Sequence, residues 1–193
     1  WLPASYCRAP SQNASLSWLK ILHGDTFRAH SMRSSPFDPG SVTDCLREYL
    51  NQHGVAFREI HHDPTPTSED SARARGESLR VGGKALVLKV GAEFKLFVLP
   101  ADRRFDSGAV KKQMATKKLR FATADELLEL TGLVPGSVPP FGHPILPLPL
   151  ICDEAIREND RIAFNAGSLT ISFVLPMDEY LRVAQPEFMA FSK

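Results

Sequence analysis

The sequence has few cysteines and no long apolar run, and both scarcities exclude broad classes of protein. Among its 193 residues are three cysteines, Cys7, Cys45 and Cys152, which lie far apart and form no C-x-x-C pair. This spacing excludes a disulfide-rich framework and a cysteine-based zinc module. The longest strongly apolar stretch, 145–152, contains two prolines and is far shorter than the roughly 20 residues that span a bilayer. We therefore expect a cytoplasmic protein that does not enter a membrane.

An excess of charge of one sign is also missing from the chain as a whole. Lys and Arg number 23 and Asp and Glu number 22, a formal net charge of +1, which argues against a nucleic-acid partner. The charges are unevenly distributed, however. The segment 73–120 holds 13 basic and four acidic residues, a net +9, and leaves −8 on the remaining chain. Such a segment either presents a basic face to phosphates or consists of ordinary solvated helix and hairpin faces.

Residues 1–40 differ in composition from the rest of the chain. They contain seven serines, four basic residues, two acidic residues and no sustained hydrophobic period. This composition is typical of a flexible extension and also of an organellar transit peptide. The chain as a whole, with 43% hydrophobic and 23% charged residues, has the composition of a globular protein. We expect an N-terminal extension over 1–40 and a single domain over 41–193.

Helical and strand patterns alternate irregularly along 41–193. The hydrophobic spacing and capping signals predict helices over 43–53, 68–76 and 107–115, after the capping box at 123–126, and from Pro176 onward. Strands are predicted over 55–61, 85–90, 94–99, 119–121, 162–165 and 169–174, with a hairpin turn at 91–93. The proline-rich stretch 134–149 predicts a shaped loop that leads into an edge strand. Together these patterns favour an α+β fold with a mixed, mostly antiparallel sheet and surrounding helices.

Lys84 occupies an unusual position among the lysines. It follows Gly82 and Gly83 and immediately precedes the apolar run Ala-Leu-Val-Leu. Its ammonium is therefore expected where a strand leaves a flexible turn. A lysine there can hold a phosphate or a carbonyl oxygen as a compact charge, or it can simply begin a strand.

The loop 132–144 is the most unusual local sequence in the chain. Its prolines fix φ, while its glycines allow conformations closed to other residues and a close approach of the backbone to a ligand. Such a loop can offer backbone N–H groups to a carbonyl oxygen or an oxyanion. The alternative is a proline-stiffened connector.

Other candidate groups are weaker. Cys152 with His143 or His62 resembles a thiol hydrolase pair, but Cys152 ends an apolar run and is expected to be an inert core residue. The HHD sequence at 61–63 suggests a metal fragment, but neighbouring residues on a strand point to opposite faces, so no metal is expected. Ser137 lacks the G-x-S-x-G context of a nucleophile.

Five segments in collinear order carry a resemblance to a known family. They are GGKALVLKV (82–90), LPADRRFD (99–106), ELTG (129–132), GSVPPFGHP (136–144) and IAFNAG (162–167). From about residue 43 to its end, the chain resembles the YbaK/ProRS-associated editing-domain superfamily. It is most similar to the free-standing YeaK-like deacylases, which also end in a segment like DEYLRVAQPE (178–187).

The resemblance implies an enzyme that hydrolyses the ester of mischarged aminoacyl-tRNA, needs no cofactor and acts for translation fidelity. Its implied partners are the 3′ end of the aminoacylated tRNA and prolyl-tRNA synthetase or another synthetase. The family's functional lysine falls on Lys84. Its substrate loop falls on Gly136, Ser137, Val138, Pro139 and Pro140, and its second pocket turn falls on Asn165, Ala166 and Gly167. Ala85 stands where the alanine-specific branch has Asn, so Ala, Ser, Thr and Cys all remain candidate substrates.

The chemistry of the substrate agrees with this reading. An aminoacyl ester is already activated, so a site can position water or the neighbouring ribose hydroxyl and stabilise the oxyanion without a side-chain nucleophile. Lys84 would anchor the terminal phosphate or polarise the ester, and the backbone of 136–140 would surround the aminoacyl group. The alternative function is a non-catalytic tRNA-binding or adaptor module with the same fold.

Overall fold

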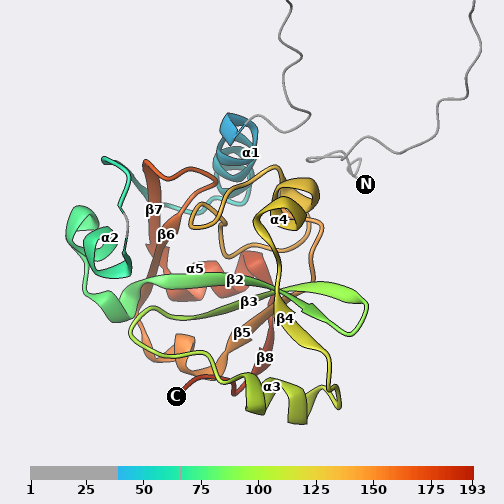
Figure 1. Ribbon diagram of the computed structural model, residues 1–193. Helices are drawn as coiled ribbons and strands as arrows, with labels where there is room; N and C mark the ends of the chain where they lie inside the picture. The colour runs from blue at the N-terminus through green and yellow to red at the C-terminus, as the bar shows by residue number, and fades with distance from the viewer. Residues whose placement is uncertain (1–38, 66) are drawn as a thin grey trace, which may run out of the picture.

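The computed structural model describes residues 39–65 and 67–193 (Figure 1). The expected N-terminal extension, with its possible targeting role, therefore lies almost wholly outside the described residues. The helices within the described ranges are α1 (Pro39–Gln52), α2 (Ser68–Arg75), α3 (Ser107–Gln113), α4 (Ala124–Thr131) and α5 (Met177–Ala184), with short 3-10 helices at Leu79–Val81 and Glu154–Glu158. The strands there are β1 (Arg58–His61), β2 (Gly83–Val90), β3 (Glu93–Pro100), β4 (Leu119–Phe121), β5 (Leu150–Asp153), β6 (Arg161–Asn165), β7 (Ile171–Pro176) and β8 (Glu187–Met189). None of these helices is long and apolar enough to cross a membrane.

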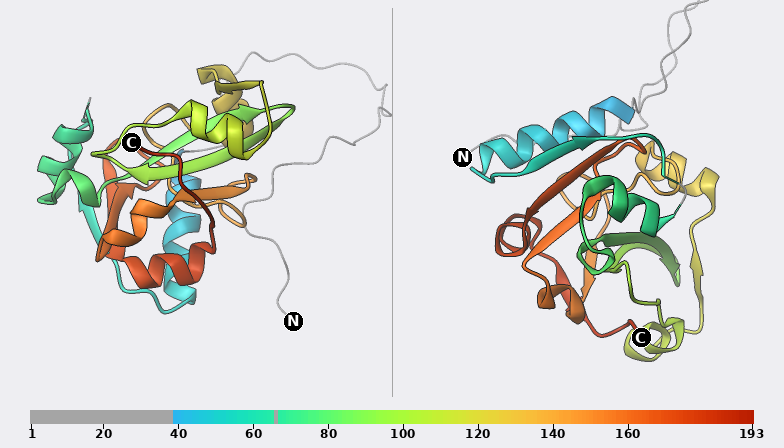
Figure 2. Two further views of the ribbon diagram at one scale, coloured as in Figure 1. Left: turned by 90° about the horizontal axis from the view of Figure 1, so that it is seen from below. Right: turned by 90° about the vertical axis from the view of Figure 1, so that its left-hand side faces the viewer.

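The strands divide between two sheets. One has the order β1-β7-β6 and is antiparallel throughout, and the other has the order β4-β2-β3-β5-β8. In the second sheet β2 pairs antiparallel with β3 and β4, whereas β5 pairs parallel with β3 and β8. Helix α5 packs on β6 and β7, and α1 lies alongside β1 (Figure 2), where Arg47 forms an ion pair with Glu59. The predicted α+β class with a mixed, mostly antiparallel arrangement is confirmed.

The two sheets meet where β2 begins. An isolated parallel bridge joins Gly82 to Ala163 of β6. A Cβ atom added to Gly83 would lie 2.7 Å from Cδ1 of Ile162, and one added to Gly82 would lie 2.9 Å from Cβ of Ala101. Both distances are shorter than van der Waals contact, so Gly83 allows β2 to approach β6, and Gly82 allows the start of β2 to pass Ala101, the residue after β3.

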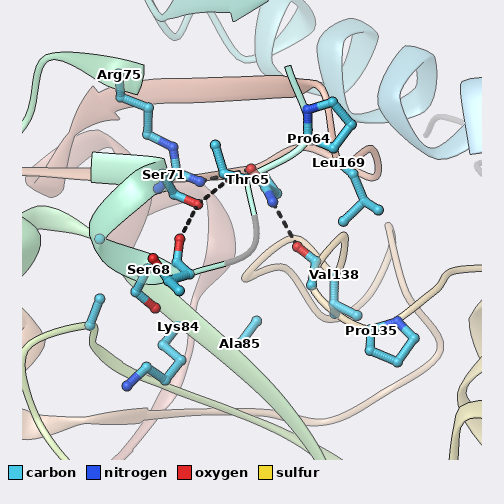
Figure 3. Close-up of a pocket in the computed structure, with 16 residues that line it drawn as sticks. Pro64, Thr65, Ser68, Ser71, Arg75, Lys84, Ala85, Pro135, Val138 and Leu169 are labelled. Atoms are coloured by element: carbon cyan, nitrogen blue, oxygen red, sulfur yellow. Dashed lines mark hydrogen bonds between the residues drawn. The ribbon is translucent and has the colours of Figure 1, made fainter. Parts of the chain in front are cut away.

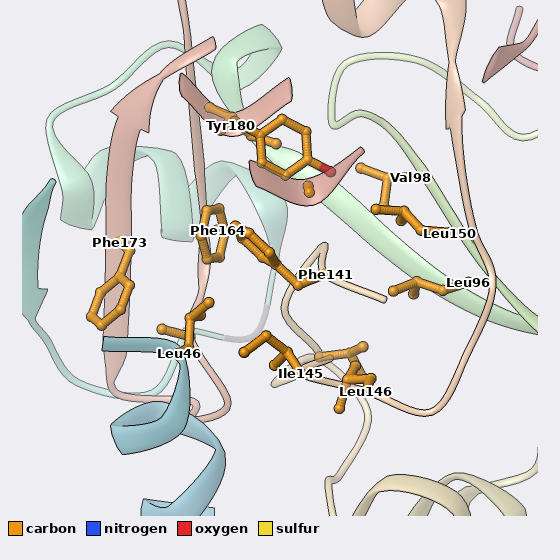
Figure 4. Close-up of a cluster of buried hydrophobic side chains, with 14 of the residues drawn as sticks. Leu46, Leu96, Val98, Phe141, Ile145, Leu146, Leu150, Phe164, Phe173 and Tyr180 are labelled. Atoms are coloured by element: carbon orange, nitrogen blue, oxygen red, sulfur yellow. The ribbon is translucent and has the colours of Figure 1, made fainter. Parts of the chain in front are cut away.

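Aromatic rings fill the space between the sheets and hold the loop that follows α4. The ring of Phe141 lies 5.6 Å from that of Phe164 and 5.3 Å from that of Tyr180, centroid to centroid (Figure 4). Tyr180 is completely buried, and its hydroxyl donates a 2.8 Å hydrogen bond to the carbonyl oxygen of Pro140. A buried tyrosine hydroxyl needs such a partner. The proline-rich loop is therefore anchored in the core.

Local signals in the sequence are confirmed where a specific residue type enforces them. The hairpin turn consists of Gly91 and Ala92, and Gly91 has φ +64°, a value that favours glycine. The predicted capping box is complete: the hydroxyl of Thr123 accepts from the amide of Glu126, and the Glu126 carboxylate accepts from the amide of Thr123. These contacts fix the start of α4.

The prediction of an edge strand after the proline-rich loop is wrong. Strand β5 lies inside its sheet, between β3 and β8. The prolines at 147 and 149 precede the strand, so each residue from Leu150 to Asp153 keeps its N–H for pairing. The outer partner β8 has three residues and was not predicted, because so short a segment carries no clear alternation. Strand β1 is also shorter than predicted and begins at Arg58, whereas β7 has the predicted length but begins and ends two residues later, at Ile171 and Pro176.

The approach of β2 to β6 can be tested through Gly83. We expect Gly83→Ala to lower the free energy of unfolding by about 1–3 kcal/mol, because the new methyl overlaps Cδ1 of Ile162. Ile162→Val alone removes this atom and should cost about 0.5–1.5 kcal/mol. Urea unfolding of the two single variants and the double variant measures the coupling. A double variant less stable than the sum of the single effects would contradict the proposed overlap.

Candidate functional site

A cleft of about 480 Å³ opens beside the junction of the two sheets (Figure 3). Five parts of the chain line it: the stretch from Pro64 into α2, the turn that starts β2, Ala101 after β3, the loop after α4, and the connection between β6 and β7. These segments are far apart in the sequence. The junction at Gly82 and Gly83 brings them together.

The structure places four of the predicted site residues in this cleft: Lys84, Gly136, Val138 and Asn165. Lys84 is half-buried, and its ammonium donates a 3.2 Å hydrogen bond to the carbonyl oxygen of Arg103. Among residues 39–65 and 67–193, no carboxylate forms an ion pair with Lys84. Its positive charge is therefore not neutralised by the fold.

Five other predicted site residues lie behind the cleft surface: Ser137, Pro139, Pro140, Ala166 and Gly167. All five are buried. The hydroxyl of Ser137 donates to the carbonyl oxygen of Val134 at 2.8 Å, and the Ser137 carbonyl accepts from the amide of Gly167 at 3.0 Å. These contacts tie the two predicted substrate segments together, and they occupy the proton that a serine nucleophile would need to transfer.

Helix α1 supports the turn 165–167 from behind. The hydroxyl of Thr43 donates a 2.6 Å hydrogen bond to the carbonyl oxygen of Ala166. Gly167 has φ +83°, and a Cβ there would lie 3.0 Å from Cγ1 of Val42. Both the backbone conformation and the close helix therefore require glycine at this position.

Arg75 lines the cleft and was not identified from the sequence. Its side chain is buried, and its guanidinium donates to the hydroxyl of Ser172 at 2.9 Å and to Oδ1 of Asn165 at 2.7 Å. The Asn165 amide in turn donates to the carbonyl oxygen of Gly136 at 2.7 Å. Arg75 thus holds Asn165, and Asn165 holds the loop after α4.

The guanidinium of Arg75 has no carboxylate partner within the described part of the chain. The neighbouring acid Glu77 is engaged by Arg58 and Arg161. Burial lowers the pKa of Arg75 to about 10, because a low-dielectric surrounding disfavours the charged form. The group remains cationic at neutral pH and contributes positive potential to the cleft.

The segment 64–71 supplies a group of hydroxyls that sequence reasoning also missed. Thr65, Thr67, Ser68 and Ser71 all line the cleft. The expected role of this segment was to cap a helix, and Thr67 does cap α2 by accepting from the amide of Asp70. The sequence feature that could have revealed this group is the high density of hydroxyl side chains in PTPTSEDS (64–71). A single helix cap needs only one of them.

The cysteine at 152 is an inert core residue, as predicted. Its side chain is completely buried, and burial raises the pKa of the thiol to about 12. Its sulfur lies 3.4 Å from the Tyr180 hydroxyl. A thiol in this environment is not ionised near neutral pH and cannot act as a nucleophile.

The histidines at 61 and 62 contact different groups, in line with their expected opposite orientations. The imidazole of His61 contacts the Glu59 carboxylate at 3.0 Å, whereas Nε2 of His62 lies 2.8 Å from the hydroxyl of Ser172. Within the described residues, no group of three or more His, Cys, Asp or Glu side chains is arranged to hold a metal ion.

Ion pairs link the basic segment 73–120 to other parts of the folded chain. Four of its basic residues form ion pairs with acids, three of which lie outside the segment: Arg73 with Asp70, Lys95 with Glu93, Arg103 with Glu158, and Arg120 with Glu126. Exposed lysines remain on α3 and the turn that follows it, at 111, 112, 117 and 118. Two acids of the segment, Glu77 and Asp106, pair in turn with Arg58, Arg161 and Lys193 outside it, so the segment and these ion-pair partners together keep the +9 read from the sequence.

The fold and the cleft agree with a family assignment. The model of the aminoacyl-tRNA editing domain family matches residues 62–183, and the chain belongs to this family. The resemblance found in the sequence is confirmed, and so is the prediction of an enzyme of the aminoacyl-tRNA deacylase class.

Individual relatives give finer comparisons. The chain is 38% identical over 161 residues to the multifunctional Ser/Thr-tRNA deacylase ProXp-y of Escherichia coli (strain K12), covering 80% of this chain and 95% of that protein. It is 30% identical over 125 residues to a proline–tRNA ligase of Shouchella clausii, of which it covers 22%. A solved structure described as a candidate trans-editing enzyme for prolyl tRNA synthetase superposes with a TM-score of 0.69 at 25% identity, over 79% of this chain and 97% of that one.

Replacement of Cys152 tests whether its thiol takes part in hydrolysis or only packs in the core. We expect Cys152→Ser to leave the rate of aminoacyl-tRNA hydrolysis unchanged, because the thiol is buried and protonated and lines no part of the cleft. Single-turnover hydrolysis of a charged tRNA, with circular dichroism to confirm folding, checks this. A folded variant that has lost hydrolysis would restore the thiol mechanism.

Proposed function

We propose that this protein hydrolyses the ester bond of tRNAs mischarged with small amino acids, with Ser and Thr as principal substrates. The observation that carries the proposal is the cleft itself, a small site with an unneutralised lysine, a backbone-lined wall and several hydroxyls. The Ser/Thr-tRNA deacylase of Escherichia coli, 38% identical over nearly its whole length, supports the choice of amino acids.

Lys84 is the proposed anchor for the tRNA. Its ammonium is bonded to one neutral carbonyl, that of Arg103, and an ammonium has three donors. Two donors therefore remain for a phosphate oxygen of the terminal adenosine or for the ester carbonyl. A compact charge at the rim of a cleft suits a phosphate contact.

Backbone amides of the loop after α4 are the proposed oxyanion donors. Within residues 39–65 and 67–193, no acceptor contacts the N–H group of Gly136 or of Val138, and both residues line the cleft. Gly136 has φ +90°, and Asn165 fixes its carbonyl oxygen. Fixed backbone donors stabilise a developing oxyanion at little reorganisation cost.

No side-chain nucleophile is needed for this reaction. Ser137 and Cys152 both lie outside the cleft, and their polar atoms are bonded within the core. The attacking oxygen is that of a water molecule, which the neighbouring ribose hydroxyl of the substrate helps to position; it adds to the ester carbonyl carbon and gives its proton to the departing ribose oxygen. The bond between the ester carbonyl carbon and the ribose oxygen breaks, and the tRNA leaves with a free hydroxyl.

The relation to prolyl-tRNA synthetase is part of the same proposal. A related domain forms part of the Shouchella clausii ligase. We infer that this chain carries out the same kind of editing in trans, on tRNA released by prolyl-tRNA synthetase or another synthetase.

The proposal is tested with Lys84→Ala. We expect this variant to keep its unfolding midpoint and to lose hydrolysis of mischarged tRNA at least about tenfold, the loss of one charge-assisted hydrogen bond. The measurement is the first-order rate of amino acid release from Ser-tRNA and Thr-tRNA at saturating enzyme, beside kcat/KM at low substrate.

The matched control is Lys89→Ala. Lys89 lies on the same strand, lines no part of the cleft, and its ammonium sits over the ring of Phe94. Equal rates in Lys84→Ala and the wild type would overturn the assigned role of Lys84. A wild type that binds tRNA but releases no amino acid would point to the adaptor function instead.

A further inference from the structure

The cleft has two walls of different chemistry. The hydroxyl wall consists of Thr65, Ser68 and Ser71, from the segment that leads into α2 and from its first turn. The apolar wall consists of Ala85, Pro135, Val138 and Leu169. In Figure 3, Ser68 and Ser71 lie across the cleft from Pro135 and Val138, with Thr65 between them. A ligand seated here meets hydroxyls on one side and hydrocarbon on the other.

Proton counting shows which hydroxyls are available to a ligand. Ser71 donates its proton to the carbonyl oxygen of Thr67 at 3.0 Å, so Thr65 is the donor in its 2.6 Å contact with Ser71. The proton of Thr65 is therefore committed, whereas its oxygen keeps acceptor capacity. The Ser68 hydroxyl has no hydrogen-bond partner within the described residues, and it offers both a donor and an acceptor.

We propose that Thr65 and Ser68 form a subsite for the side-chain hydroxyl of the substrate amino acid and determine specificity. The substrate hydroxyl donates to Oγ1 of Thr65 and accepts from the hydroxyl of Ser68. The methyl group of a threonyl substrate then lies against the apolar wall. This inference rests on the proposed deacylase function and adds the residues that select the amino acid.

The subsite distinguishes a hydroxyl from a methyl group. An aminoacyl group without a hydroxyl displaces water from Thr65 and Ser68 and returns no hydrogen bond. A site built to bond a hydroxyl rejects the analogue that lacks it far more strongly than an apolar pocket rejects a missing methyl. Threonine and valine have nearly the same shape, and so this pair isolates the hydroxyl.

The experiment uses one tRNA charged in turn with Ser, Thr, Ala and Val by an aminoacylating ribozyme, so that the nucleic acid is constant. We expect the wild-type kcat/KM to favour Thr over Val, and Ser over Ala, by about tenfold or more. Thr65→Val and Ser68→Ala should each reduce these ratios several-fold, and the double variant should bring them close to one. Hydrolysis of Ala-tRNA should persist in all three variants.

Ser68→Ala removes no hydrogen bond within the described part of the fold, so loss of folding does not confuse its result. The matched control is Ser78→Ala, since Ser78 is exposed, makes no capping hydrogen bond and lies outside the cleft. This variant should keep the wild-type ratios.

Each other outcome has a separate meaning. Equal wild-type rates on Thr and Val overturn the subsite but leave the deacylase function standing. A uniform loss on all four amino acids in Thr65→Val and Ser68→Ala also overturns it, because the wall would then bind a group common to all substrates, such as the α-ammonium. A wild type inactive on all four charged tRNAs contradicts the proposed function itself.

Discussion

The close approach of β2 to β6 is the constraint on which the rest of the structure depends. Gly83 has no side chain and lets the two sheets meet, because Ile162 of β6 fills the space that its Cβ atom would need, and the backbone of Gly82 bridges to Ala163 of β6. Lys84 follows directly, so the lysine whose ammonium has no carboxylate partner in the described chain is placed by the same contact that closes the core. Packing and site geometry are therefore not independent here. A change that separates the sheets also displaces Lys84 from its place in the cleft.

The electrostatic potential in the cleft depends on which basic side chains have no acidic partner in the described part of the fold. Ion pairs with acids neutralise Arg73, Arg103 and Arg120. Arg75, in contrast, is buried among neutral oxygens. An uncompensated buried charge is costly, and a fold retains it at a cost to stability. The resulting potential favours negative charge in the cleft, both on a phosphate and on an ester oxygen as the carbonyl carbon is attacked.

Sequence reasoning identified the parts of the fold that depend on one residue type. The hairpin at Gly91, the capping box at Thr123 and the glycines before Lys84 could be predicted, because each has a local physical cause. The internal position of β5 could not, since it depends on parallel pairing with a three-residue strand near the C-terminus. In the site, Lys84 and the loop at Gly136 were found through their neighbours in the sequence. Arg75 and the hydroxyls of 65–71 were not, because an arginine in a helix and hydroxyls before one have common solvent-exposed roles, and only the tertiary fold turns them inward.

The support that α1 gives to the turn 165–167 limits how the protein can be dissected. The family match covers 62–183, a range that leaves out α1, β1 and β8. Yet Thr43 bonds to Ala166, and Val42 packs against Gly167. A fragment trimmed to the matched range would keep every residue that lines the cleft and lose the scaffold that holds one side of it. We therefore expect a transplanted editing domain to hold the turn 165–167 in place only if it includes its leading helix.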